Sequence, residues 1–180
     1  MIRLFCAIEL PLAARERLAG LAGGVPGARW TPVENMHLTL RFIGDIDEVT
    51  AADAAEALDD VRAPGLDIAI EGVGAFARGR HPSLLWAGVA RTPALVHLHE
   101  RIESALVRAG LAPEGRKYTP HVTLARLKGS PHGRVEDFIA AHALLRVAPF
   151  HATRFTLFSS LRAHDAPIYR AEAEYRFAQD

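Results

Sequence analysis

The chain has 180 residues, of which 49% are hydrophobic and 23% are charged, enough to bury one core without disulfides. The number of lysine plus arginine residues (21) equals that of aspartate plus glutamate (21), which argues against a long basic surface that binds many phosphates. No apolar run approaches the roughly 18 residues of a membrane span, and the apolar start contains Glu9 and ends at Pro11, so it predicts a strand and not a signal peptide.

The first half of the chain alternates strands and helices. Apolar periodicity predicts strands at 3–10, 36–44 and 65–76, and helices at 12–22 and 48–61. Gly23 and Gly24 follow the first helix. Thr50 is the expected N-cap of the second helix.

The same order then begins again. The pattern predicts strands at 84–90, 120–127 and 150–160, helices at 92–110 and 134–145, and a final strand at 167–177. Thr92 before Pro93 is the start signal of the third helix. Each half thus runs strand, helix, strand, helix, strand, a duplication too long in period for a solenoid.

The repeated order predicts one domain, residues 1–180, made of a first unit at about 1–80 and a second unit at about 83–180. Two similar units would most simply pack as two lobes about an approximate two-fold axis. We expect an α+β fold with two pseudo-symmetric lobes, whose largely antiparallel sheets face each other across a central cleft. No glycine-rich phosphate turn follows any strand, as a doubly wound nucleotide-binding fold would show.

The middle strand of each unit carries the same short pattern, MHLTLRF at 36–42 and PHVTLAR at 120–126. Because side chains alternate along a strand, His37 and Thr39 share one face, and the same holds for His121 and Thr123. Each face presents an imidazole and a hydroxyl ~6.6 Å apart along the strand. If the two strands meet, two imidazoles and two hydroxyls surround one small volume.

Such a site suits a phosphodiester. Near neutral pH one histidine can be neutral and another protonated, so the pair can act as general base and general acid. The hydroxyls and an arginine, Arg126 or Arg41, could donate hydrogen bonds to the non-bridging oxygens. Arg126 lies five residues after His121, so in a regular strand its side chain would point to the opposite face. A role at the phosphate therefore needs a bulge, a strand end or a side chain that extends around the strand.

These motifs resemble those of the 2H phosphoesterase superfamily. The likeness includes LFCAIELP, WTPVENMHLTLRFIG, GVGAF, LLWAGV and PHVTLARL. Together they are similar to the bacterial and archaeal RNA 2′,3′-cyclic phosphodiesterases, historically called 2′-5′ RNA ligases. The segment KYTPHVTL departs from that family, which has phenylalanine and a basic residue before the proline; Tyr118 keeps an aromatic ring, but Thr119 supplies no cation.

The resemblance implies hydrolysis of a 2′,3′-cyclic phosphodiester at RNA 3′ ends, or on nucleotides, to a 2′-phosphomonoester. In that reaction His37 is the proton donor to the departing 3′ oxygen and His121 is the proton acceptor from water. Thr39, Thr123 and Arg126 bind the phosphate.

The remaining features set the protein's expected surroundings. The sequence shows no Asp, Glu and His cluster with the spacing of metal ligands, so we expect no metal and no other cofactor. The single Cys6 fits a reducing cytoplasm. We expect a monomer with no protein partner and no membrane contact.

Two alternatives remain open at this stage. A 2′-5′ RNA ligase acting on tRNA half-like ends would run the same chemistry backwards with the same residues. A non-catalytic binder of phosphorylated RNA ends or cyclic nucleotides would tolerate Asn or Gln at either motif histidine, and the presence of both His37 and His121 favours an enzyme.

Other histidines and aromatic residues have simpler interpretations. His97 and His99 are two apart on a helix and point about 200° apart, so they cannot chelate together and should be solvated. His151, in a third His-x-Thr, has no duplicate partner and marks the approach to a strand. The aromatic residues that flank the motifs could stack on a terminal base or pack in the core: Trp30, Phe42 and Tyr118.

Overall fold

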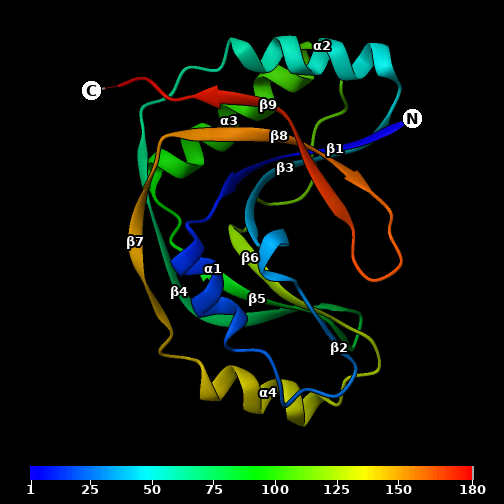
Figure 1. Ribbon diagram of the computed structural model, residues 1–180, viewed down its shortest axis with the longest axis vertical. Helices are drawn as coiled ribbons and strands as arrows, with labels where there is room; N and C mark the ends of the chain where they lie inside the picture. Colours follow the sequence, from blue (N-terminus) through cyan, green and yellow to red (C-terminus); the bar gives the residue numbers. More distant parts are fainter. Residues whose placement is uncertain (180) are drawn as a thin grey trace.

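The structure is a computed structural model that describes residues 1–179 (Figure 1). The elements in chain order are β1 (Ile2–Glu9), α1 (Leu12–Ala19), β2 (Ala28–Trp30), η1 (Val33–Asn35), β3 (His37–Ile46), α2 (Glu48–Asp59), β4 (Leu66–Arg78), β5 (His81–Val89), α3 (Pro93–Arg108), β6 (His121–Leu127), α4 (His132–Ala141), β7 (Arg146–Ala152), β8 (Arg154–Leu161) and β9 (Ile168–Arg176). The predicted order of strands and helices is confirmed.

Some element boundaries differ from the prediction. The strand expected at 150–160 is two strands, β7 and β8, separated at Thr153, and neither β2 nor the 3₁₀ helix η1 was expected. The predicted N-cap Thr50 is wrong, because the helix begins earlier and the carboxylate of Asp47 accepts from the Thr50 backbone N–H at 2.8 Å. Thr92 does cap α3, accepting from the Leu95 N–H at 3.2 Å.

The strands form one sheet in the order β7-β4-β5-β6-β3-β1-β8-β9, with β2 added beside β6. All strand pairs are antiparallel, as expected for the α+β class. The joint between β3 and β6 is narrow, with a single pair of facing residues, Leu38 and Val122. It divides the sheet into two parts, one holding β4 to β7 and the other holding β1, β3, β8 and β9.

Each part of the sheet contains strands from both halves of the chain. The third strand of the first unit, β4, pairs with β5 and β7, while β8 of the second unit pairs with β1. The reason lies in the short turn at Gly79 and Arg80, where Arg78 faces His81 across the hairpin. Two-residue connections place consecutive strands side by side, so this turn carries β4 into the second part. Each half of the chain therefore does not form its own lobe. Instead, each part of the sheet takes strands from both halves.

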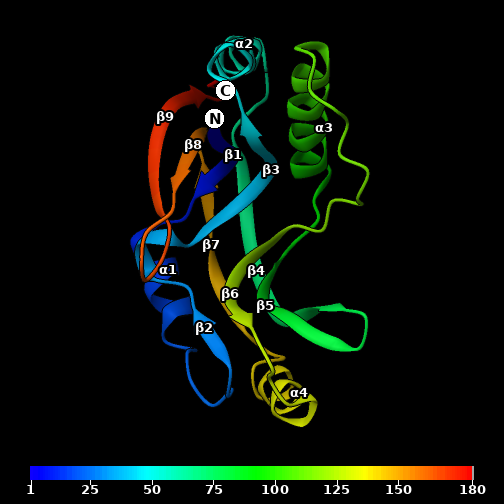
Figure 2. The ribbon, with the colours of Figure 1, turned by 90° about the vertical axis from the view of Figure 1, so that its right-hand side faces the viewer.

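The hydrophobic core and the helices pack around the sheet. One large hydrophobic cluster runs through the molecule, and a small one lies on the opposite face of β1, around Phe5, Ala7 and Phe158. The helices α2 and α3 pack against each other at one end, and α4 lies at the other (Figures 1 and 2). Cys6 is fully buried, and burial raises the pKa of its thiol to about 12. None of the helices within residues 1–179 has the length and apolar character to cross a membrane.

A close approach between β4 and β5 depends on glycine. The Trp86 indole lies across Gly74, so that a Cβ at this position would stand 2.4 Å from the ring atoms Cζ2 and Cη2. Trp86 in turn packs against Phe76 and lies 6.3 Å from His121, ring centre to ring centre. Gly74 therefore allows the aromatic layer that supports the second motif.

Replacement of Gly74 by alanine should destabilise the protein, because the added methyl displaces the Trp86 ring. We expect a loss of about 1–3 kcal/mol in the free energy of unfolding, the usual cost of overpacking, measured by urea denaturation. Gly133→Ala is the matched control, since an added Cβ in α4 meets nothing within 4 Å and should be neutral or slightly stabilising. Equal stability of the two variants would contradict this role for Gly74.

Candidate active site

The two motif strands meet at the narrow joint of the sheet. Leu38 faces Val122 in antiparallel register, and both side chains are fully buried. His37 and Thr39 lie on either side of Leu38 on β3, and His121 and Thr123 lie on either side of Val122 on β6, so all four are within one residue of the joint. The apolar pair therefore seals the core behind the joint, while the imidazoles and hydroxyls share the open face.

A bulge in β6 brings Arg126 to that face. Leu84 on β5 faces Arg126 on β6, and Trp86 faces Thr123. The two β5 residues are two positions apart in the sequence, but the two β6 residues are three positions apart. Leu124 is the extra residue, and it reverses the alternation of side chains. The odd offset noted in the sequence is thereby cancelled, because Arg126 now shares the face of Thr123 and His121.

A matching bulge in β3 changes the alternation of side chains before Arg41. Ala7 faces Thr39 and Cys6 faces Arg41, so Leu40 is the extra residue here. Arg41 is buried, and its guanidinium donates to the Glu103 carboxylate and to the carbonyls of Phe42 and Ala112. Arg41 thus has a structural role, but it also lines the cleft, so its contact with a phosphate stays a prediction.

His37 lies in an aromatic environment. Its ring stacks on Phe5 with centroids 4.8 Å apart and meets the edge of Tyr169 at 5.4 Å. Nδ1 donates to the Asn35 carbonyl at 2.8 Å, so Nε2 carries the lone pair and accepts from the Thr39 hydroxyl at 2.9 Å. Burial lowers the pKa of His37 to about 4, with a smaller contribution from the charge of His121.

His121 is held in the same way. Its Nδ1 donates to the Thr119 carbonyl at 2.6 Å, again two residues earlier in the chain, which leaves Nε2 as the acceptor. The ring meets Phe76 edge-on at 5.0 Å. Burial lowers the pKa of His121 below its usual value. Burial therefore favours the neutral form of both imidazoles in the free protein, with the same tautomer.

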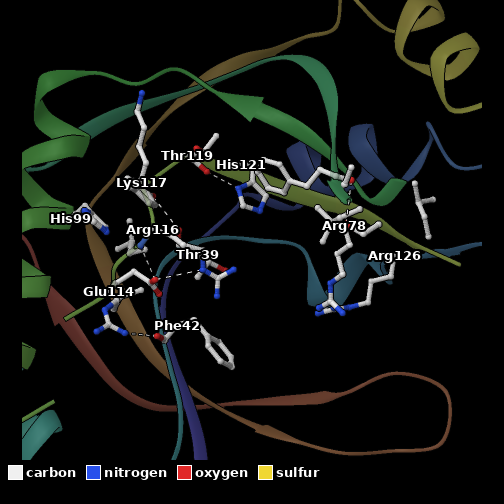
Figure 3. A pocket seen from close by; sticks show the side chains of 18 residues that line it. Thr39, Phe42, Arg78, His99, Glu114, Arg116, Lys117, Thr119, His121 and Arg126 are labelled. Atoms are coloured by element: carbon white, nitrogen blue, oxygen red, sulfur yellow. Dashed lines mark hydrogen bonds and ion pairs between the residues drawn. The ribbon is translucent and has the colours of Figure 1, made fainter. Parts of the chain in front are cut away.

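A cleft of about 760 Å³ opens beside this joint (Figure 3). Thr39, His121 and Arg126 line it directly, whereas His37 and Thr123 do not belong to its lining. His37 contacts the cleft through its bond to Thr39. The cleft is basic although the whole chain is neutral, because five cations and one carboxylate line it: Arg41, Arg78, Arg116, Lys117, Arg126 and Glu114.

The other histidines have separate roles. His97 is exposed on α3, as expected. His99 was expected to be solvated, but its ring stacks on Tyr118 with centroids 4.0 Å apart and lines the cleft. His151 bonds to the Asp67 carboxylate at 2.8 Å on a different surface. No group of three or more His, Cys, Asp or Glu side chains within residues 1–179 is arranged to hold a metal ion.

The aromatic residues also separate into two kinds. Trp30 packs on Phe138, and Tyr118 donates its hydroxyl to the Thr39 carbonyl at 3.1 Å. Phe42 is 50% exposed and lines the cleft. The residues that surround the imidazoles were missed in the sequence, although they lie in strands with visible alternation: Phe5, Phe76, Trp86 and Tyr169.

Comparison with solved structures shows the same fold elsewhere. Escherichia coli LigT complexed with 3′-AMP superposes with a TM-score of 0.79 at 26% identity, over 99% of each chain. The Thermus thermophilus protein TT0787 shares the fold at a TM-score of 0.75 and 22% identity, over 97% of each chain.

Sequence relatives point to the same class. The chain matches the 2′-5′ RNA ligase superfamily over residues 11–164. A Thermotoga maritima protein named RNA 2′,3′-cyclic phosphodiesterase is 34% identical over 185 residues, covering 98% of this chain and 96% of the relative. One with the same name from Aeropyrum pernix is 34% identical over 152 residues, covering 81% and 84%. The chain belongs to the 2′-5′ RNA ligase superfamily, as its two motifs predicted.

Proposed function

We propose that the protein is an RNA 2′,3′-cyclic phosphodiesterase, which hydrolyses the cyclic phosphate at RNA 3′ ends, or on nucleotides, to a 2′-phosphomonoester. The observation that carries the proposal is the pair of imidazoles at one strand joint, each with Nδ1 bonded to a backbone carbonyl and Nε2 left as the reactive nitrogen. The names of the relatives support the same reaction class.

The two histidines divide the proton transfers. His121 accepts a proton from water at Nε2 while the water oxygen forms a bond to phosphorus. His37 donates a proton from Nε2 to the 3′ oxygen as the bond from phosphorus to that oxygen breaks. The 2′-phosphomonoester leaves with His121 protonated and His37 neutral, and exchange with solvent restores the starting state.

Thr39, Thr123 and Arg126 bind the phosphate in this proposal. A hydroxyl and a guanidinium donate hydrogen bonds to the non-bridging oxygens, where negative charge accumulates in the transition state. The Thr39 hydroxyl donates to His37 in the free protein, so substrate binding requires this hydroxyl to rotate toward the phosphate. That rotation releases Nε2 of His37 for its proton.

The low pKa of His37 fits an acid that becomes protonated only when the substrate is bound. Burial keeps the ring neutral in the free protein, and a bound phosphodiester anion raises the pKa of both imidazoles by favouring their charged forms. Substrate binding is therefore coupled to the uptake of a proton by His37. This coupling avoids two buried positive charges at the empty joint.

The wider setting of the reaction is part of the proposal. The imidazoles supply both proton transfers, so we propose that turnover needs neither a metal nor another cofactor. We further propose that residues 1–180 act as a single domain with two motif units, at about 1–80 and 83–180, and as a cytoplasmic monomer.

The direct test is a short RNA that ends in a 2′,3′-cyclic phosphate, incubated with and without a chelator. We expect a 2′-phosphomonoester, identified by ³¹P NMR, at a rate that the chelator leaves unchanged. Joined RNA in the presence of a 5′-hydroxyl acceptor would instead indicate the ligase. Tight binding with no product would indicate the non-catalytic binder.

Removal of either motif histidine should abolish most of the activity. We expect His37→Ala and His121→Ala each to lower kcat by about 10²- to 10⁴-fold, the usual contribution of a positioned acid or base. Glutamine at either position should be equally inactive, because an amide cannot carry the proton. His97→Ala on the exposed face of α3 is the matched control. Near-normal turnover by a folded variant at either position, with folding checked by circular dichroism, would contradict the assignment.

A further inference from the structure

The cleft has two unlike ends, although the strands on which it is built match. Phe42 and Arg126 each lie five residues after a motif histidine, and the paired bulges turn both toward the cleft. His99, whose ring stacks on Tyr118, lies at one end of the cleft with Arg116, Lys117 and Glu114. The other end carries Arg78 and Arg126.

Arg78 and Arg126 form the basic end. Arg78 is the last residue of β4, at the tip of the β4–β5 hairpin, and Arg126 lies near the end of β6. The register sets Phe76, Leu84 and Arg126 in a row across β4, β5 and β6, so the hairpin tip lies next to Arg126. Figure 3 shows both guanidinium groups reaching the same place, at the opposite side of the cleft from His99.

Neither of these two arginines is neutralised by the protein. The ion pairs formed within residues 1–179 involve neither Arg78 nor Arg126. At the opposite end, by contrast, Arg116 lies 3.6 Å from the Glu114 carboxylate. Two neighbouring like charges repel each other unless an anion lies between or beside them. The basic end is therefore suited to more negative charge than the protein supplies.

A cyclic phosphodiester carries a single negative charge, which Arg126 and the two threonine hydroxyls can meet. The second cation therefore indicates a second anion. A terminal nucleotide of RNA has one, the phosphodiester on its 5′ side, which a free cyclic mononucleotide lacks. With the base stacked at Phe42, as single-stranded RNA bases commonly do on aromatic rings, the remaining phosphate would lie toward the basic end.

We propose that Arg78 binds the phosphodiester on the 5′ side of the terminal nucleotide and makes the enzyme prefer RNA ends over cyclic mononucleotides. This specificity role rests on the proposed hydrolysis at the two histidines. A guanidinium suits the task, because it can donate two parallel hydrogen bonds to one phosphate.

The test compares kcat/KM for a dinucleotide and for a mononucleotide, both ending in a 2′,3′-cyclic phosphate. We expect Arg78→Ala to lower the ratio of the two values about 10-fold, since a charge-assisted hydrogen bond is lost only with the dinucleotide. Arg80→Ala, two residues further in the same hairpin, removes an equal charge outside the cleft lining and should leave the ratio unchanged.

A dinucleotide with a neutral methylphosphonate linkage provides the complementary probe. The wild-type protein should disfavour it about 10-fold against the natural linkage, and Arg78→Ala should not distinguish the two. A dinucleotide preference that is unchanged in Arg78→Ala would overturn the specificity role. If neither substrate were turned over, hydrolysis itself would be refuted. The Arg78 role would then be decided by the same ratio in dissociation constants for the 2′-phosphate forms.

Discussion

The site depends on one backbone contact, the antiparallel pair of Leu38 on β3 and Val122 on β6. This pair is the only register point between the two parts of the sheet within the described residues, and it brings together motifs that lie 84 residues apart in the sequence. Its buried side chains fix which face of each strand is open. A slip of one residue on either strand would turn a histidine and a threonine into the core.

Two local features convert this joint into a functional surface. The bulges at Leu40 and Leu124 change the alternation of both strands directly after the motif threonines. As a result Arg41 is buried and donates to Glu103 and two carbonyls, while Arg126 and Phe42 are exposed, although all three line the cleft. The same device thus produces a buried structural cation on one strand and a free cation on the other.

The orientation of the imidazoles follows from the chain just before each motif. The carbonyls of Asn35 and Thr119 fix the protons on Nδ1, and the aromatic rings on β1, β4 and β9 limit the solvent around both histidines. The same burial that positions the rings also lowers the pKa of each. Position and acid strength therefore have one physical origin.

The sequence predicted the order of elements and the shared face of each histidine and threonine, because both follow from local periodicity and from the duplication. It did not predict the exchange of β4 and β8 between the parts of the sheet, since pairing partners are not encoded in local pattern. The bulges were also invisible, because Leu40 and Leu124 continue the apolar alternation. Arg126 was therefore left dependent on geometry, and the burial of Arg41 against Glu103 was not predicted.

The most direct test of the paired histidines is the pH dependence of kcat/KM with an RNA bearing a terminal 2′,3′-cyclic phosphate. The base must be neutral while the acid is protonated, so kcat/KM should rise with pH through the lower of the two histidine pKa values and fall through the higher. Because burial lowers the pKa of both rings, that of His37 to about 4, the maximum should lie on the acid side of the ordinary histidine value of 6.5. The falling limb of kcat should lie at higher pH, since the bound anion favours the charged imidazole. A kcat/KM that kept rising past about pH 9 would indicate attack by hydroxide without a histidine acid and would contradict the account.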